Sequence, residues 1–154
     1  MKHVDIWTDG AARGNPGPGG YGAVIKYVDK IGCETRLELK EGFNNTTNNR
    51  MELLSAIVAL EKLKEPCEVI LTSDSKYLVD AFNKNWIGEW LKNDFRRGKT
   101  NEVKNIDLWE RIIKLTEKHK VEFLWVKGHN NNIENERCDT LANIAIDELL
   151  MKAQ

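Results

Sequence analysis

The chain has 154 residues and a formal net charge of −1, with 41% hydrophobic and 31% charged residues. This balance is ordinary for a globular chain, so we expect one domain over residues 1–154 with a substantial core. Because there is no global basic field to attract nucleic acid, any such partner has to be held by a local patch or by bound metal.

The cysteines and the apolar runs indicate the cellular compartment in which the protein acts. Cys33, Cys67 and Cys138 are odd in number, widely spaced and form no CxxC pair, which is typical of a reducing compartment. No apolar run approaches the length of a membrane span, and the first residues do not resemble a signal peptide. We therefore expect a cytoplasmic protein with no membrane partner.

The first predicted element is a strand over residues 4–9, where the sequence VDIWTD alternates with a period of two. Gly10 and a loop rich in glycine and proline follow, and this composition should neither continue a strand nor begin a helix. Asp9 is therefore predicted at the carboxyl end of a strand, where open α/β sheets place ligands. The alternative is that Asp9 and Gly10 form a hairpin turn.

The next two predicted strands are Tyr21–Val28 and Thr35–Lys40. Asp29, Lys30 and Gly32 supply the turn between them. Because the second of these strands has one polar face, we expect it at an edge of the sheet. The first three strands of the chain should form an antiparallel meander.

A strong helix is predicted over Asn48–Lys64. Four apolar residues repeat at helical spacing, namely Leu53, Ala56, Ile57 and Leu60. Thr46, Thr47 and Asn48 are candidate N-caps. Glu52 lies about one turn into the helix, on a side with small residues that would let it approach the sheet closely. The alternative is that Glu52 is a first-turn carboxylate favoured by the helix dipole.

The apolar run Glu68–Thr72 is typical of a central strand buried on both faces. It leads through Asp74 directly into a predicted helix over Lys76–Phe82. A strand, a helix and a further strand imply a right-handed crossover and a parallel pair. If this strand lies beside the first, Asp9 and Asp74 occupy adjacent strand ends. The alternative for Asp74 is an N-cap of the helix.

Aromatic and basic residues interleave in the segment Asn85–Thr100. They are Trp86, Trp90 and Phe95 together with Lys92, Arg96, Arg97 and Lys99. One interpretation is an amphipathic helix whose aromatic side chains enter the core. The other is a nucleic-acid-binding segment whose basic side chains contact phosphates. Composition leaves both interpretations open.

The C-terminal part begins with a predicted helix over Asn105–Lys118 and a fifth strand over Val121–Val126. A polar loop then carries His129. A single histidine in a loop is most often simply exposed, so the sequence pattern alone assigns it no role.

The last predicted helix, Asn135–Leu150, places Asp139 on the same side as its apolar stripe, near the helix N-terminus. Asp9, Glu52, Asp74 and Asp139 then all fall at one edge of the predicted sheet. Four such carboxylates would repel one another without a counter-charge. Hard divalent cations with oxygen ligands, Mg²⁺ or Mn²⁺, resolve this repulsion. Two such ions clamp a phosphodiester, so we expect metal-assisted phosphodiester hydrolysis.

Six motifs make a family resemblance visible. They are TDG at 8–10 followed by GNPG at 14–17, TTNNRMEL at 46–53, TSDS at 72–75, VKNIDLW at 103–109, WVKGH at 125–129 and ENERCD at 134–139. With these motifs the sequence resembles a bacterial type 1 ribonuclease H over nearly all its length. The set in this order is highly specific.

The resemblance implies an α/β fold of the ribonuclease H type, with a mixed five-stranded sheet flanked by helices. It implies an Mg²⁺-dependent endonuclease, with two ions and with Mn²⁺ as a substitute, that cleaves the RNA strand of RNA–DNA hybrids. The ends would be 5′-phosphate and 3′-hydroxyl, and we expect the enzyme to act as a monomer.

The resemblance also implies roles for the acidic residues and the histidine. Asp9 would bind both ions, Glu52 and Asp74 would complete one metal site, and Asp139 would complete the other. His129 would assist proton movement or product release.

Residues that bind the hybrid follow from the same resemblance. Asn15 and Asn48 would read ribose 2′-hydroxyls, whereas Thr47 and Asn105 resemble parts of a DNA-phosphate pocket. Trp86 resembles a contact with DNA sugar. The basic protrusion of the family would be formed by Lys92, Arg96, Arg97 and Lys99.

The sequence departs from the family pattern at two places, and two rival functions call for a test. Asn93, Asp94 and Glu102 dilute the basic protrusion, and Lys76 stands where a common relative has glutamine. One rival is a catalytically inert module that binds RNA–DNA hybrids. The other is a related nuclease of the same fold, such as a junction resolvase.

Overall fold

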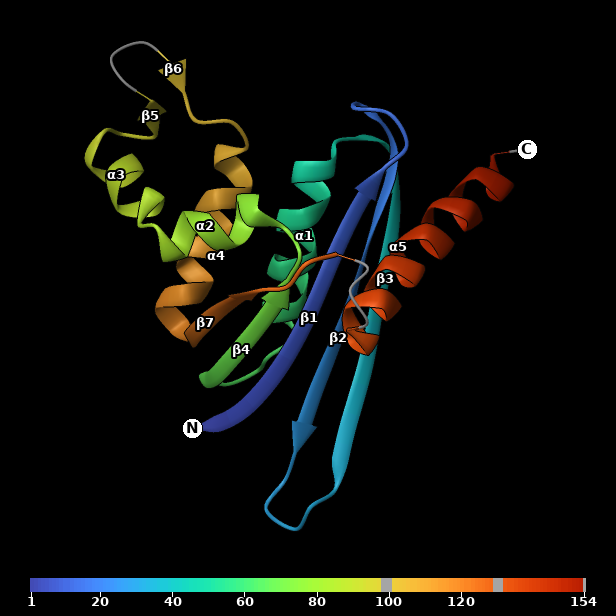
Figure 1. Cartoon of the computed structure of the whole chain (residues 1–154), viewed down its shortest axis with the longest axis vertical. Helices are drawn as coiled ribbons and strands as arrows, with labels where there is room; N and C mark the ends of the chain where they lie inside the picture. The colour runs from blue at the N-terminus through green and yellow to red at the C-terminus, as the bar shows by residue number, and fades with distance from the viewer. Residues whose placement is uncertain (98–100, 129–131, 154) are drawn as a thin grey trace.

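Five strands form one mixed sheet in this computed structural model (Figure 1). The structure describes residues 1–97, 101–128 and 132–153. The strands are β1 (Lys2–Ala12), β2 (Gly17–Val28), β3 (Glu34–Thr46), β4 (Cys67–Ser73) and β7 (Lys120–Trp125). Their order is β3-β2-β1-β4-β7, antiparallel from β3 to β1 and parallel from β1 to β7. The predicted sheet, its meander and the edge position of the third strand are confirmed.

The helices are α1 (Asn48–Glu61), α2 (Lys76–Asn83), α3 (Trp86–Lys92), α4 (Ile106–Lys118) and α5 (Ile133–Lys152). Thr47 is the N-cap of α1, because its hydroxyl accepts a hydrogen bond of 3.2 Å from the main-chain N–H of Arg50. α5 begins two residues before the predicted start, since Asn132 caps it in the same way. Among the described residues, no helix has the length and apolar composition needed to cross a membrane.

The first strand does not end at Asp9, and the prediction that the glycine-rich stretch cannot continue a strand is wrong. β1 runs on to Ala12, and Asp9 pairs with Gly22 of β2. The hairpin turn therefore lies beyond both Asp9 and Gly10. Glycines stay in this ladder because α5 packs directly on their main chain. A Cβ atom at Gly22 would overlap the carbonyl oxygen of Cys138.

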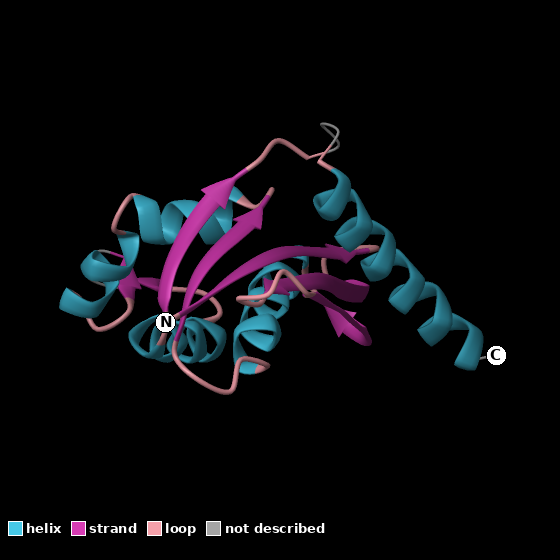
Figure 2. Cartoon of the chain, turned by 90° about the horizontal axis from the view of Figure 1, so that it is seen from below, coloured by secondary structure: helices cyan, strands magenta, loops and turns pink. Residues whose placement is uncertain are grey.

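α1 and α5 cover opposite faces of the sheet (Figure 2). Successive side chains of a strand point to opposite faces. Ile6 therefore joins the main core under α1, whereas Trp7 packs against a small cluster under α5. That cluster consists of Val24, Cys138 and Leu141.

The aromatic and basic segment forms α3 and continues into a short hairpin of β5 (Arg96–Arg97) and β6 (Asn101–Glu102). Trp90 is buried and meets Trp109 edge-on, with ring centroids 5.0 Å apart. The core interpretation is therefore correct for Trp90. Trp86 is 38% exposed and remains available to a partner. Figure 1 shows this segment projecting at one end of the molecule.

Candidate active site

Sheet register brings Asp9 and Asp74 to the same level. The parallel ladder between β1 and β4 ends with the pair Thr8 and Ser73, and each aspartate is the next residue in its chain. Asp74 is not the cap of α2. That place is taken by Ser75, whose hydroxyl accepts a hydrogen bond of 3.2 Å from the main-chain N–H of Leu78.

Glu52 reaches the two aspartates because α1 lies against the main chain of β1. A Cβ atom at Gly10 would overlap the main-chain nitrogen of Glu52, so only glycine permits this approach. Glu52 is the fifth residue of α1, beyond the first turn. The interpretation of Glu52 as a first-turn carboxylate is therefore wrong, and its position follows from the contact with the sheet.

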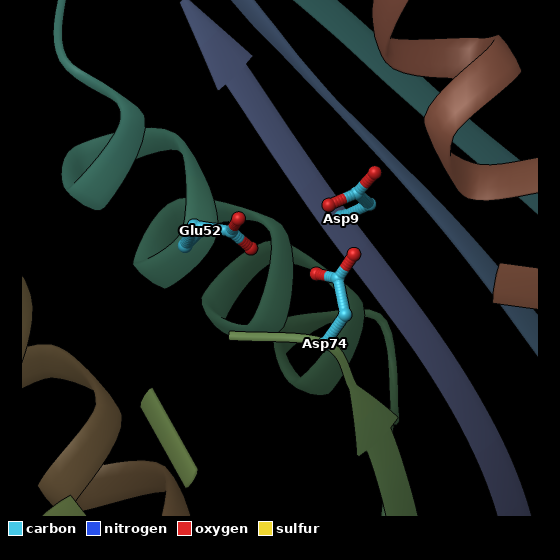
Figure 3. Close-up of side chains that lie close together, drawn as sticks. All are labelled: Asp9, Glu52 and Asp74. Atoms are coloured by element: carbon cyan, nitrogen blue, oxygen red, sulfur yellow. The ribbon is translucent and has the colours of Figure 1, made fainter. Parts of the chain in front are cut away.

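The three side chains point toward one another (Figure 3). One carboxylate oxygen from each of Asp9, Glu52 and Asp74 lies within 4.8 Å of the others. Oε2 of Glu52 is buried and has no hydrogen-bond partner among the described residues. Burial, together with the charges of Asp74 and Asp139, raises the pKa of Asp9 to about 9. Burial and Asp9 likewise raise the pKa of Glu52 well above its usual range.

These observations fit a hard divalent cation. Buried carboxylates are normally paired with a positive group or coordinate a metal. An unpartnered oxygen on Glu52, aimed at two other carboxylates, offers the all-oxygen ligand set that Mg²⁺ and Mn²⁺ prefer. A cation would return the group to its ionised form, since opposite charge lowers a carboxyl pKa.

Asp139 is not part of this three-residue group, although its charge acts on Asp9. It is half-buried on α5, nearly two turns from the helix start rather than the one turn predicted. The structure thus brings together three of the four predicted carboxylates and places the fourth nearby. His129 lies outside the described residues.

Trp125, the last residue of β7, contacts the main chain of Asp74 and is itself covered by Lys76 of α2. The indole N–H of Trp125 donates a hydrogen bond of 3.0 Å to the main-chain oxygen of Asp74. The ammonium of Lys76 lies 4.7 Å above the ring of Trp125. The sequence analysis assigned no role to Trp125. Its place in the WVKGH motif is the one signal that could have identified it.

Asn15 and Asn48, predicted to read ribose, are brought together over the hairpin turn. The side-chain oxygen of Asn15 accepts a hydrogen bond of 3.2 Å from the main-chain N–H of Asn48. The side-chain oxygen of Asn48 in turn accepts one of 2.6 Å from the main-chain N–H of Ala12.

The predicted phosphate pocket residues lie around Arg50, which sequence reasoning did not single out. Its guanidinium donates to the side-chain oxygen of Asn105 at 3.1 Å and pairs with Asp107 at 2.7 Å. The Asn105 amide donates to the hydroxyl of Tyr77 at 3.1 Å. Arg50 and Asp107 each lie inside a family motif, but the spacing of residues within a motif could not show that these two side chains form an ion pair.

The remaining predicted binding residues lie on the projecting segment. Trp86 and Lys92 belong to α3, and Arg96 and Arg97 form β5. Lys99 falls outside the described residues.

Comparison with known proteins agrees with the fold. A model of the RNase H family matches residues 1–147. The ribonuclease H of Lachnoclostridium phytofermentans is 54% identical over 145 residues, covering 94% of this chain and 92% of that protein. The crystal structure of LC9-RNase H1, a type 1 RNase H with the type 2 active-site motif, matches with a TM-score of 0.86 at 30% identity, covering 96% and 74% of the two chains. LC11-RNase H1, solved in complex with an RNA/DNA hybrid, matches with a TM-score of 0.69 at 30% identity, covering 96% and 99%.

The mixed sheet with an acidic group where the parallel ladder of β1 and β4 ends, taken with these matches, defines an α/β enzyme of the nuclease class. Its members bind nucleic acid and generally depend on a divalent metal. The chain belongs to the ribonuclease H family, and the resemblance found in its motifs is confirmed.

Proposed function

We propose that this protein is an endonuclease that hydrolyses the RNA strand of RNA–DNA hybrids and leaves 5′-phosphate and 3′-hydroxyl ends. The observation that carries the proposal is the partly buried group of Asp9, Glu52 and Asp74 within a chain of the ribonuclease H family. The solved relative in complex with an RNA/DNA hybrid supports the substrate class.

Asp9, Glu52 and Asp74 would hold Mg²⁺, with Asp139 completing a second site and Asp9 shared between two ions. Mn²⁺ would substitute. When bound, such ions supply Lewis-acid stabilisation of a phosphoryl oxygen and lower the pKa of water. The unpartnered oxygen of Glu52 supports its role as a ligand. His129 is assigned to proton movement or product release by family resemblance alone.

The chain's own residues would orient the duplex. Asn15 and Asn48 lie together at one end of β1, where they would contact ribose hydroxyls of the RNA strand. Thr47 and Asn105 flank Arg50, which would contact a phosphate of the DNA strand.

The projecting segment would add a second contact with the DNA strand. Trp86 would lie against a sugar. Lys92, Arg96, Arg97 and Lys99 would contact phosphates. Because α3 is separate from the carboxylate group in sequence and carries no ligand of it, these contacts would position the hybrid and take no part in hydrolysis.

The test is a gel of end-labelled RNA–DNA hybrid, duplex RNA, duplex DNA and single strands, each with Mg²⁺ and with EDTA. We expect cleavage of the hybrid RNA strand only, and only with Mg²⁺. Binding of the hybrid with Mg²⁺ but without cleavage would favour an inert binding module. Cleavage of branched DNA would favour a related nuclease of the same fold.

We further propose a monomeric single domain that acts in the cytoplasm. All three cysteines are free, and two of them, Cys67 and Cys138, are buried, which fits a reducing compartment.

A further inference from the structure

The turn between β1 and β2 contacts both helices that carry acidic residues of the site. Arg13 is its first residue, directly after the end of β1. The main-chain N–H of Arg13 donates a hydrogen bond of 2.7 Å to the carbonyl oxygen of Pro18, which closes the turn. The turn is therefore closed by its own main chain.

On one side, the turn is tied to α5. The guanidinium of Arg13 pairs with Asp147 at 2.7 Å and donates to the side-chain oxygen of Asn143 at 3.2 Å. These partners are four residues apart, so they lie on one side of the helix. The amide of Asn143 reaches back to Asp139, at 3.0 Å from its main-chain oxygen and 3.5 Å from its carboxylate.

On the other side, the turn is tied to α1. Asn48, the first residue of α1, exchanges hydrogen bonds with Ala12 and Asn15, which flank Arg13. Glu52 follows Asn48 by one helical turn. A continuous set of polar contacts therefore runs from the helix of Glu52, through the turn, to the helix of Asp139.

α5 packs on the sheet through a row of mostly small or apolar side chains, among them Cys138, Ala142 and Ala145. α5 meets the main chain of Gly20, Gly22 and Gly42, so these three positions of the sheet offer no side chain of their own to the helix. The buried apolar cluster beneath it is small. Ion pairs also tie α5 to β3, from Arg137 to Glu38 and from Glu148 to Lys40. The contact of Arg13 leads on through Asn143 to Asp139.

We propose that Arg13 is a positioning residue, which fixes the place of Asp139 relative to the other three carboxylates. Through the same contacts it would couple the binding of ribose at Asn15 and Asn48 to the position of α5. The coupling to ribose rests on the proposed function. The positioning of α5 by Arg13 does not, because it follows from contacts within the chain.

The matched variants are Arg13→Gln and Asn143→Ala, which remove the tether at its two ends. Lys40→Gln is the control, because Lys40 also ties the sheet to α5, through Glu148 at 2.8 Å, without touching the turn or Asp139. Exposed ion pairs of this kind add little to stability. We therefore expect all three variants to have melting temperatures within a few degrees of the original chain.

The first measurement is amide hydrogen exchange in EDTA, without substrate. We expect faster exchange in residues 139–147 for Arg13→Gln and Asn143→Ala, but not for Lys40→Gln. Adding hybrid should slow exchange in residues 139–147 of the original chain and of Lys40→Gln. It should not slow exchange in these residues of Arg13→Gln. Unchanged exchange in Arg13→Gln would overturn the positioning role.

The second measurement is steady-state cleavage of hybrid. We expect kcat to fall about fivefold in Arg13→Gln and Asn143→Ala with KM changed less than twofold, since a displaced ligand affects the reacting geometry more than duplex binding. An equal loss in Lys40→Gln would show that the tether has only a structural role. If the original chain fails to cut hybrid, the proposed function is wrong, whereas exchange without substrate still decides the role of Arg13.

Discussion

Asp9 and Asp74 lie side by side at the end of the parallel ladder between β1 and β4. The last residues paired in this ladder are Thr8 and Ser73, and each aspartate directly follows one of them. One register thus places two acidic side chains together at the point where the parallel ladder ends. Burial and mutual repulsion then keep the pKa of Asp9 high in the absence of metal. The arrangement costs stability unless a cation is bound.

Replacing Asp9 by asparagine should abolish hybrid cleavage in Mg²⁺ while hybrid binding survives. A neutral amide cannot serve as the shared ligand of two cations. The same change should stabilise the metal-free protein. Because the pKa of Asp9 is about 9 when folded, against about 3.9 when unfolded, the folded state loses stability as pH rises between these values. Asparagine avoids this loss.

Urea unfolding in EDTA measures the difference. We expect the free energy of unfolding of the variant to exceed that of the original chain by several kcal/mol at pH 8 and by little at pH 4, since each unit of pKa difference is worth about 1.4 kcal/mol. Adding Mg²⁺ should raise the melting temperature of the original chain more than that of the variant. Near-normal cleavage by Asp9→Asn would rule out the two-metal assignment.

Replacing Gly10 by alanine should displace Glu52 without touching a carboxylate. The new methyl group would overlap the main chain of Glu52 and Met51, which belongs to a packed helix and cannot simply rotate away. We expect a loss of about 2 kcal/mol in stability and roughly a hundredfold loss in kcat/KM.

Gly32→Asn is the control for Gly10→Ala. Gly32 has a φ of +87°, which asparagine tolerates, and a Cβ atom there would meet nothing within 4 Å. Denaturation and initial-rate assays compare the two variants. Equal activity of Gly10→Ala and the original chain would mean that close contact of α1 with β1 is not what places Glu52.

Reversing Arg96 and Arg97 to glutamate should weaken hybrid binding about tenfold and lower the salt slope of binding by about 2. Turnover at saturating hybrid should be largely kept, because phosphate contacts position the duplex and do no chemistry. Binding is followed by fluorescence anisotropy between low and physiological salt.

The double reversal of Lys62 and Lys64 gives the same change of charge beyond the end of α1, away from α3. It should leave the salt slope nearly unchanged. If the double variant of Arg96 and Arg97 had the same salt slope as the original chain, β5 would be exposed to solvent and would take no part in binding the hybrid.

The enzyme should cut within a run of ribonucleotides paired to DNA, but barely at one ribonucleotide embedded in DNA. Asn15 and Asn48 come from different elements, so they should contact successive sugars. Each lost hydrogen bond costs about 1 kcal/mol, so losing several reduces productive binding strongly. DNA duplexes with one, two and four consecutive ribonucleotides test this. Efficient incision at one ribonucleotide would assign the chain to a different class of ribonuclease H.

The sequence by itself indicated the five strands of the main sheet, the helices α1, α2, α4 and α5, and the acidic candidates. Period-two alternation marked the meander, and helical spacing of apolar residues marked α1 and α5, because burial of one face imposes these periods. The motifs around Asp9, Glu52 and Asp74 were sufficient to identify the family. Local pattern could not tell that β1 would continue past Asp9, since Gly10 lies against α1 and the glycines of β2 opposite it lie against α5.

Only the tertiary structure decided which residues meet. The closeness of Glu52 to Asp9 depends on α1 lying against Gly10, and the link between Arg13 and Asn143 joins residues that are 130 positions apart. Arg50 meets Asp107 across 57 positions for the same reason. Such contacts arise from how the helices pack on the sheet. The spacing of apolar residues in the sequence shows which face of one element is buried, but it does not show which element packs against that face.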